Sequence, residues 1–142
     1  MKKVIEFGTN PVEISIGNRR ISTALLGRPH DAYTITVSRN GKRFSFTFHN
    51  SVVNSFKYEK DLTELMILGL QSEIDDSLSY AYNQNKEDFA DEFGYVGSLR
   101  KNLTRAYNGC KRAHENLNRL FGTPEDIRDF YEILENMREE LS

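Results

Sequence analysis

Residues 33–48 alternate between apolar and polar side chains in a pattern that predicts a β-hairpin. Two runs with a period of two, residues 33–39 and 42–48, flank Asn40-Gly41, the dipeptide that a type I′ turn favours. A two-residue turn sets the register of the two strands. The resulting pairs are Val37 with Phe44, Ile35 with Phe46 and Tyr33 with Phe48. One face of the hairpin is therefore apolar and needs cover, whereas the other face is polar.

Shorter alternating runs before the hairpin predict further strands. Val12–Ile16 alternates and ends at Gly17-Asn18, so Arg19–Leu26 is interpreted as its return strand. Val4–Phe7 is interpreted as another short strand. Together these segments predict an antiparallel sheet of three to five strands within about residues 1–50.

From residue 60 the apolar period becomes helical. Asp61 is the expected N-cap, and Glu64, three positions later, completes a capping box. The apolar positions that follow extend the helix toward Ile74. Residues 75–86 fit either a continued helix or a polar loop.

Three further helices are expected in the C-terminal half. A short helix covers Lys86–Phe93 and ends at Gly94, and a continuous apolar stripe runs from Leu99 to Phe121. Gly122 ends that stripe, and Thr123-Pro124 supplies an N-cap and an N1 proline for the last helix. The short link predicts that the last two helices form an antiparallel pair, able to pack on the apolar face of the hairpin.

These elements predict a single α+β domain over residues 1–142. In it, an N-terminal antiparallel sheet with a central hairpin packs against three to four C-terminal helices over about residues 60–142. A chain of 142 residues is long enough for one buried core. The single cysteine, the absence of a signal-like N-terminus and the short apolar run Leu65–Leu70 favour a cytoplasmic protein with no membrane segment.

Charge is unevenly distributed although the net charge is only −2. Residues 1–57 carry nine Lys or Arg and three acids, and residues 58–96 carry ten acids and two lysines. Residues 97–121 are basic again, and residues 122–142 are acidic. Such blocks either neutralise one another across the fold or present a charged face to a partner.

No segment carries a recognisable catalytic, cofactor or metal motif. Cys110 and His114 are four residues apart on the predicted long helix, but a stable zinc site needs three or four ligands. We interpret Cys110 as a buried structural residue beside an exposed histidine. The chain contains neither Gly-x-Ser-x-Gly nor a glycine-rich phosphate loop, so we expect a protein without enzymatic activity and without a cofactor.

Two charged groups are candidates for binding a partner. The hairpin tip carries Arg39, Lys42 and Arg43, and the acidic stretch offers Asp75, Asp76, Glu87 and Asp91. Basic side chains also lie on the polar side of the predicted long helix, so nucleic acid is an alternative partner.

A loose pattern of core and capping residues resembles a known group of proteins. It comprises the strand Phe44-Ser-Phe-Thr-Phe-His-Asn-Ser51, an Asp-Leu-x-x-Leu helix, the segment Asp88–Tyr95 with Phe-Gly-Tyr at its end, and a Leu120-Phe-Gly122 terminus. This resembles small accessory proteins of phages and mobile elements with a Phe-x-x-Phe-x-x-Glu-Phe-Gly-Tyr pattern. Those proteins often have cysteine at the position of Ala90.

The resemblance implies an interaction protein, since some proteins of that kind are anti-CRISPR or other anti-defence inhibitors. We therefore expect a non-enzymatic phage or mobile-element protein. It would bind and inhibit a host protein complex, such as a CRISPR effector nuclease. The alternative is a nucleic-acid-binding accessory protein that uses the basic hairpin and helix surface.

Overall fold

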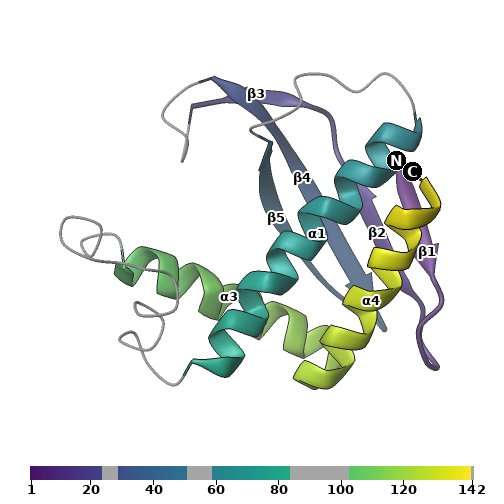
Figure 1. The fold of residues 1–142 in the computed structure, drawn as a ribbon, viewed down its shortest axis with the longest axis vertical. Coiled ribbons are helices and arrows are strands. Elements are labelled where there is room, and N and C mark those ends of the chain that lie inside the picture. The colour runs from purple at the N-terminus through teal and green to yellow at the C-terminus, as the bar shows by residue number, and fades with distance from the viewer. Residues whose placement is uncertain (24–28, 51–58, 84–102, 142) are drawn as a thin grey trace. The chain divides into compact units, whose positions relative to one another are not determined.

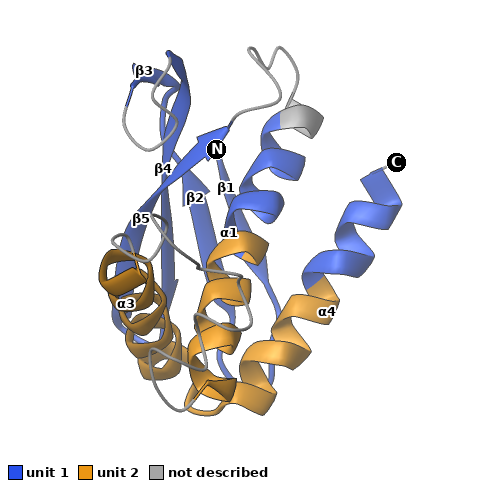
Figure 2. Ribbon diagram, turned by 60° about the vertical axis from the view of Figure 1, so that its left-hand side comes forward, with its two compact units in different colours: residues 1–70, 134–142 blue, residues 71–133 orange. Residues whose placement is uncertain are grey.

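The computed structural model describes residues 1–23, 29–50, 59–83 and 103–141. The chain divides into two compact units, one of residues 1–70 with 134–142 and the other of residues 71–133 (Figure 2). Among the described residues, the first unit contains a five-stranded antiparallel sheet, and three helices follow the sheet along the chain. The predicted α+β class is confirmed.

The sheet is organised around one long central strand, β4 (Figure 1). Its strands are β1 Lys2–Ile5, β2 Val12–Ile16, β3 Arg20–Ser22, β4 His30–Arg39 and β5 Lys42–Asn50. On one side β4 pairs with β2 over Ile35–Ser38 and with β3 over His30–Ala32. On the other side it pairs with β5 over Asp31–Arg39.

The predicted hairpin register is confirmed, with Val37 opposite Phe44, Ile35 opposite Phe46 and Tyr33 opposite Phe48. We call the side of β5 that carries Phe44, Phe46 and Phe48 the core face, and the side that carries Arg43, Ser45 and Thr47 the outer face. On the core face of β4, Tyr33, Ile35 and Val37 are almost completely buried. Burial of this apolar row stabilises the sheet.

The predicted partner of the third strand is wrong. Arg20–Ser22 pairs with β4 and not with β2. The edge of β2 that faces away from β4 is occupied by β1, with Ile5 opposite Val12. The chain leaving β2 stays beside β4, because the Gly17 N–H donates to the Thr34 carbonyl at 2.9 Å. The first strand also lies earlier than predicted, at Lys2–Ile5.

Helix α1 is longer than the sequence pattern indicated, running from Glu59 to Tyr82. Asp61 is therefore not its N-cap, since the helix already includes the two residues before it. The open choice for residues 75–86 is settled as helix as far as Tyr82. The Asn83 side chain then donates to the Ser79 carbonyl at 2.6 Å.

In the first unit, α1 packs closely on the core face of the sheet at Gly69. A Cβ built on Gly69 would meet the Ile35 side chain and would lie 3.0 Å from Cγ of Phe48. Leu65, Met66 and Leu70 of the same helical stretch are buried as well. The glycine therefore allows the helix backbone to approach closer than any other residue would.

The second unit combines the end of α1 with α3, Leu103–Phe121, and the start of α4, Pro124–Leu141. Tyr80 contacts Tyr107 at 5.5 Å between ring centroids, next to a small core of Leu103 and Cys110. Cys110 is buried as predicted. His114 is half-buried rather than exposed, because its ring contacts Tyr80.

The junction between α3 and α4 confirms the predicted end and cap. Gly122 has φ +92°, a value that favours glycine, and the Asp126 N–H donates to the Thr123 hydroxyl at 3.1 Å. The rings of Phe121 and Phe130 form a tilted contact beside the turn, with centroids 4.9 Å apart. Within the second unit, residues 124–133 of α4 run away from α3 beyond the turn rather than back alongside it (Figure 1), so the predicted antiparallel pair is wrong there. The helix predicted for residues 86–93 lies outside the described residues, as do residues 99–102.

We predict that Gly69→Ala destabilises the fold by about 1–2 kcal/mol, because the new methyl group must displace Ile35 or Phe48. This loss outweighs the gain of about 1 kcal/mol in helix propensity. Gly109→Ala in α3 is the matched control, since its Cβ would meet nothing within 4 Å. The control should stabilise the protein by about 0.5–1 kcal/mol in urea unfolding. Equal stabilisation by both substitutions would contradict the close contact.

Candidate partner-binding site at the hairpin tip

The hairpin tip, Arg39–Arg43, is held in a defined conformation by its own backbone. Asn40 has φ +51° and Gly41 has φ +77°, as expected for a type I′ turn. The ladder between β4 and β5 continues up to the closing pair Arg39–Lys42. Lys42 and Arg43 are consequently exposed on a rigid turn rather than on a flexible loop.

Arg39 fastens the tip to the turn between β1 and β2. Its Nε donates to the Asn10 carbonyl at 2.9 Å, and its Nη2 donates to the Phe7 carbonyl at 3.1 Å. The guanidinium also lies over the Phe7 ring, 4.9 Å from the centroid. These contacts join the hairpin tip to the β1–β2 turn, so Arg39 acts as a brace between the two turns.

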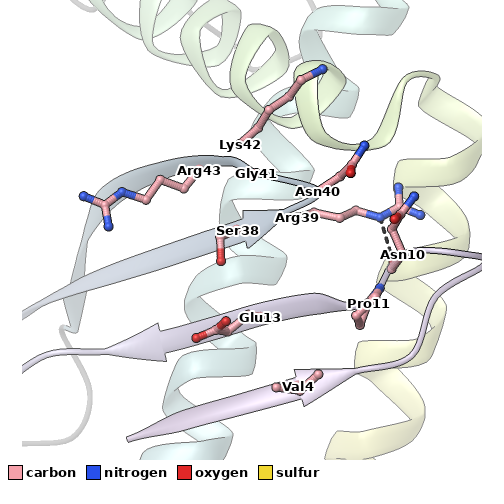
Figure 3. Close-up of a pocket in the computed structure, with 10 residues that line it drawn as sticks. All are labelled: Val4, Asn10, Pro11, Glu13, Ser38, Arg39, Asn40, Gly41, Lys42 and Arg43. Atoms are coloured by element: carbon pink, nitrogen blue, oxygen red, sulfur yellow. Dashed lines mark hydrogen bonds between the residues drawn. The ribbon is translucent and has the colours of Figure 1, made fainter.

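An open hollow of about 450 Å³ lies beside the tip (Figure 3). Its rim combines both turns with the ends of β1, β2, β4 and β5, and includes Arg39, Lys42 and Arg43. In Figure 3 the side chains of Lys42 and Arg43 point in different directions, away from the braced guanidinium. Val4 supplies an exposed apolar patch, and Glu13 is paired with Lys2 at 2.7 Å. The lining of the hollow therefore combines three cationic side chains with one carboxylate and the exposed Val4.

The outer face of the sheet carries an ordered polar network. Arg20 donates to the hydroxyls of Thr34 and Thr47 at 2.8 and 3.1 Å, and the hydroxyls of Thr36 and Ser45 are 2.7 Å apart. Because these side chains bond to one another across strands, the outer face is preorganised.

A histidine pair lies at the end of the hairpin opposite the tip. His30 Nε2 and His49 Nδ1 are 2.7 Å apart, so one ring donates a hydrogen bond to the other. Burial, together with the charges of His30 and Arg20, lowers the pKa of His49. The lowered pKa favours the uncharged form of the His49 ring in this contact between β4 and β5.

A second open hollow, of about 400 Å³, lies between the β2–β3 connection and the start of α1. Tyr33 and Arg19 line it, and the Arg19 guanidinium is 3.9 Å from the buried carboxylate of Asp31. Burial and the neighbouring Asp31 raise the pKa of Tyr33. At that distance the ion pair is loose, and the described side chains that supply polar groups to the hollow are Asn18, Arg19 and Tyr33.

The acidic candidates lie in the second unit, on α1. Asp75 and Asp76 are exposed there, and Glu73 beside them is half-buried. Burial raises the pKa of Glu73 to about 7, with a further contribution from Asp76, whereas Arg112 of α3 acts in the opposite direction. Although the Asp76 side chain is exposed, partial desolvation on the helix surface and the neighbouring Asp75 raise its pKa to about 6.

The predicted site residues therefore separate into three groups. The structure brings Arg39, Lys42 and Arg43 together at the rim of one hollow. Asp75 and Asp76 belong to the other unit, and Glu87 and Asp91 lie outside the described residues.

Sequence reasoning missed the bracing role of Arg39 and the contribution of the β1–β2 turn. Both depend on contacts between residues about 30 positions apart, such as Arg39 with Asn10, which no local pattern reveals. It also did not predict that burial raises the pKa of Glu73. Its position next to the buried Ile74 on the helix was the only available signal.

Within the described segments, no group of three or more His, Cys, Asp or Glu side chains is arranged to hold a metal ion. None of the described helices is long and apolar enough to cross a membrane. No family model matches the chain, and no match was found among curated proteins or solved structures.

We predict that Glu73→Gln removes part of the pH dependence of stability. The pKa of Glu73 is raised from 4.5 to about 7, so the folded state keeps a proton that the unfolded state loses. The stability that this group contributes is complete below pH 4.5 and disappears as the pH rises to about 7. The variant should match the parent at pH 4 and exceed it by about 1–3 kcal/mol at pH 8.

Urea unfolding between pH 4 and pH 8 tests this prediction. Glu115→Gln, at an exposed position of α3 in the same unit, is the control and should give a curve parallel to that of the parent. A difference between Glu73→Gln and the parent that does not change with pH would contradict the raised pKa.

Proposed function

We propose that this chain is a non-enzymatic binding protein of a phage or mobile element that attaches to a host protein complex through its hairpin tip. In the form we favour, the complex is a defence assembly such as a CRISPR effector nuclease, and binding inhibits it. The observation that carries the proposal is the exposure of Lys42 and Arg43 on a turn that Arg39 braces.

A braced cationic tip is well suited to binding an acidic protein surface. The type I′ turn and the two carbonyl contacts of Arg39 fix the backbone before a partner arrives, so little conformational entropy is lost on binding. Lys42 and Arg43 supply charge for electrostatic attraction, and the exposed Val4 supplies apolar contact area.

The exposed basic side chains of α3 support nucleic acid as the second candidate partner. Arg105, Lys111 and Arg112 are exposed on α3, in the second unit. A basic helix with this distribution can contact phosphates, and such binding weakens steeply as salt is added.

The double substitution Lys42→Glu/Arg43→Glu should separate the two functions. We expect it to weaken capture of the host complex by at least about tenfold, equivalent to about 1.4 kcal/mol. It should also abolish any protection of phage from restriction in a plaque assay. Arg105→Glu/Lys111→Glu makes the same charge change on α3 and should leave both results unchanged.

A parallel titration with random-sequence DNA and RNA completes the test. If the proposed function is correct, binding of DNA or RNA at about 150 mM salt should not depend on Lys42 or Arg43. If both double substitutions weaken nucleic-acid binding and neither affects phage restriction, the accessory nucleic-acid function is supported and the proposed function is contradicted.

A further inference from the structure

In the described part of the sheet, β5 is an edge strand. There, β5 pairs with β4 alone. The two-residue turn makes Arg39–Lys42 a hydrogen-bonded pair, so alternate residues from Lys42 onward direct their backbone groups to β4. The backbone N–H and carbonyl groups of Ser45, Thr47 and His49 therefore point away from β4.

Edge strands of this length are usually protected against pairing with another strand. Proline, a bulge or a charged side chain in the middle of the strand normally provides that protection. β5 has nine residues, contains no proline, and carries only uncharged side chains over Phe44–Phe48. Its regular register with β4 shows no bulge. The strand thus has the properties of one that pairs.

The side chains of β5 follow the same pattern in both directions from Phe46. Ser45 and Thr47 flank it, then Phe44 and Phe48. In an antiparallel pair of two β5 strands centred on Phe46, hydroxyl residues would face hydroxyl residues and phenylalanines would face phenylalanines. The strand is therefore complementary to a second copy of itself.

Charge favours the antiparallel arrangement of two copies. Lys42 and Arg43 are at one end of β5, and His49 and Asn50 are at the other. Antiparallel pairing places Arg43 opposite His49 of the second copy, and the lowered pKa of His49 keeps that ring uncharged near neutral pH. Parallel pairing would instead bring the cationic ends of both copies together, which is unfavourable.

The aromatic side chains of β5 also gain from such a contact. Phe46 and Phe48 are half-buried in the chain, in contrast to Phe44, which is 7% exposed. Pairing at Phe46 would place the two copies of that ring side by side on the core face. It would remove further apolar surface from water.

We propose that two copies of this chain pair antiparallel through their β5 edges, centred on Phe46, and join their sheets into one continuous sheet. The expected partner is thus a second copy of the chain, bound by backbone hydrogen bonds and by the phenylalanine row. The pairing is centred on Phe46, and the hairpin tips lie at the two ends of the paired strands. The inference therefore does not depend on the identity of a host complex.

Sedimentation velocity of the full chain from about 1 μM to about 200 μM tests the pairing, a range that brackets a micromolar dissociation constant. We expect a monomer–dimer equilibrium. Two double substitutions then test the register. Ser45→Glu/Thr47→Glu and Ser45→Lys/Thr47→Lys each place like charges opposite one another and should weaken the dimer by at least about tenfold. An equimolar mixture should dimerise again, because opposite charges then face each other.

Thr47→Pro provides a second, independent variant. The Thr47 N–H points away from β4, so proline removes a donor from the edge without removing a bond between β4 and β5. The variant should keep its circular dichroism spectrum and be monomeric. The proposal is overturned if the parent is monomeric throughout the concentration range, if these substitutions leave a dimer intact, or if the mixture stays monomeric.

Discussion

The two-residue turn at Asn40-Gly41 determines the arrangement of the first unit. Because both residues adopt positive φ, the turn joins β4 and β5 without a bulge and sets every cross-strand pair from Arg39–Lys42 to Asp31–Asn50. A shift of one residue would exchange the two faces of β5 and move its phenylalanines to the polar side. The contact of Gly69 with Ile35 and Phe48 exists only in the observed register.

The same turn connects the fold to the proposed activity. It places Arg39 where its guanidinium reaches the carbonyls of the β1–β2 turn, and it leaves Lys42 and Arg43 exposed beside the hollow. It also decides which backbone groups of β5 point outward. The proposed binding tip and the proposed pairing edge are therefore two consequences of one local structure, and they meet at Arg43.

Local signals in the sequence predicted the elements that depend on local physics. The Asn-Gly dipeptide with alternating flanks predicted the hairpin and its register, and Thr123-Pro124 predicted the start of the last helix. Contacts between distant residues escaped prediction, among them the pairing of β3 with β4 and the brace at Arg39. Helix α1 continued through a polar stretch because tertiary contacts bury Ser77 completely, an effect that outweighs its modest helix propensity.

The most direct test of this account is an NMR measurement of contacts between Hα protons across the hairpin. In the observed register, residues of the non-hydrogen-bonded pairs have their Hα protons close together. We expect strong nuclear Overhauser effects between Ser38 and Arg43, between Thr36 and Ser45, and between Thr34 and Thr47. Effects displaced by one residue, such as Thr36 with Phe44 or Phe46, would contradict the register and with it the placement of both the tip and the β5 edge.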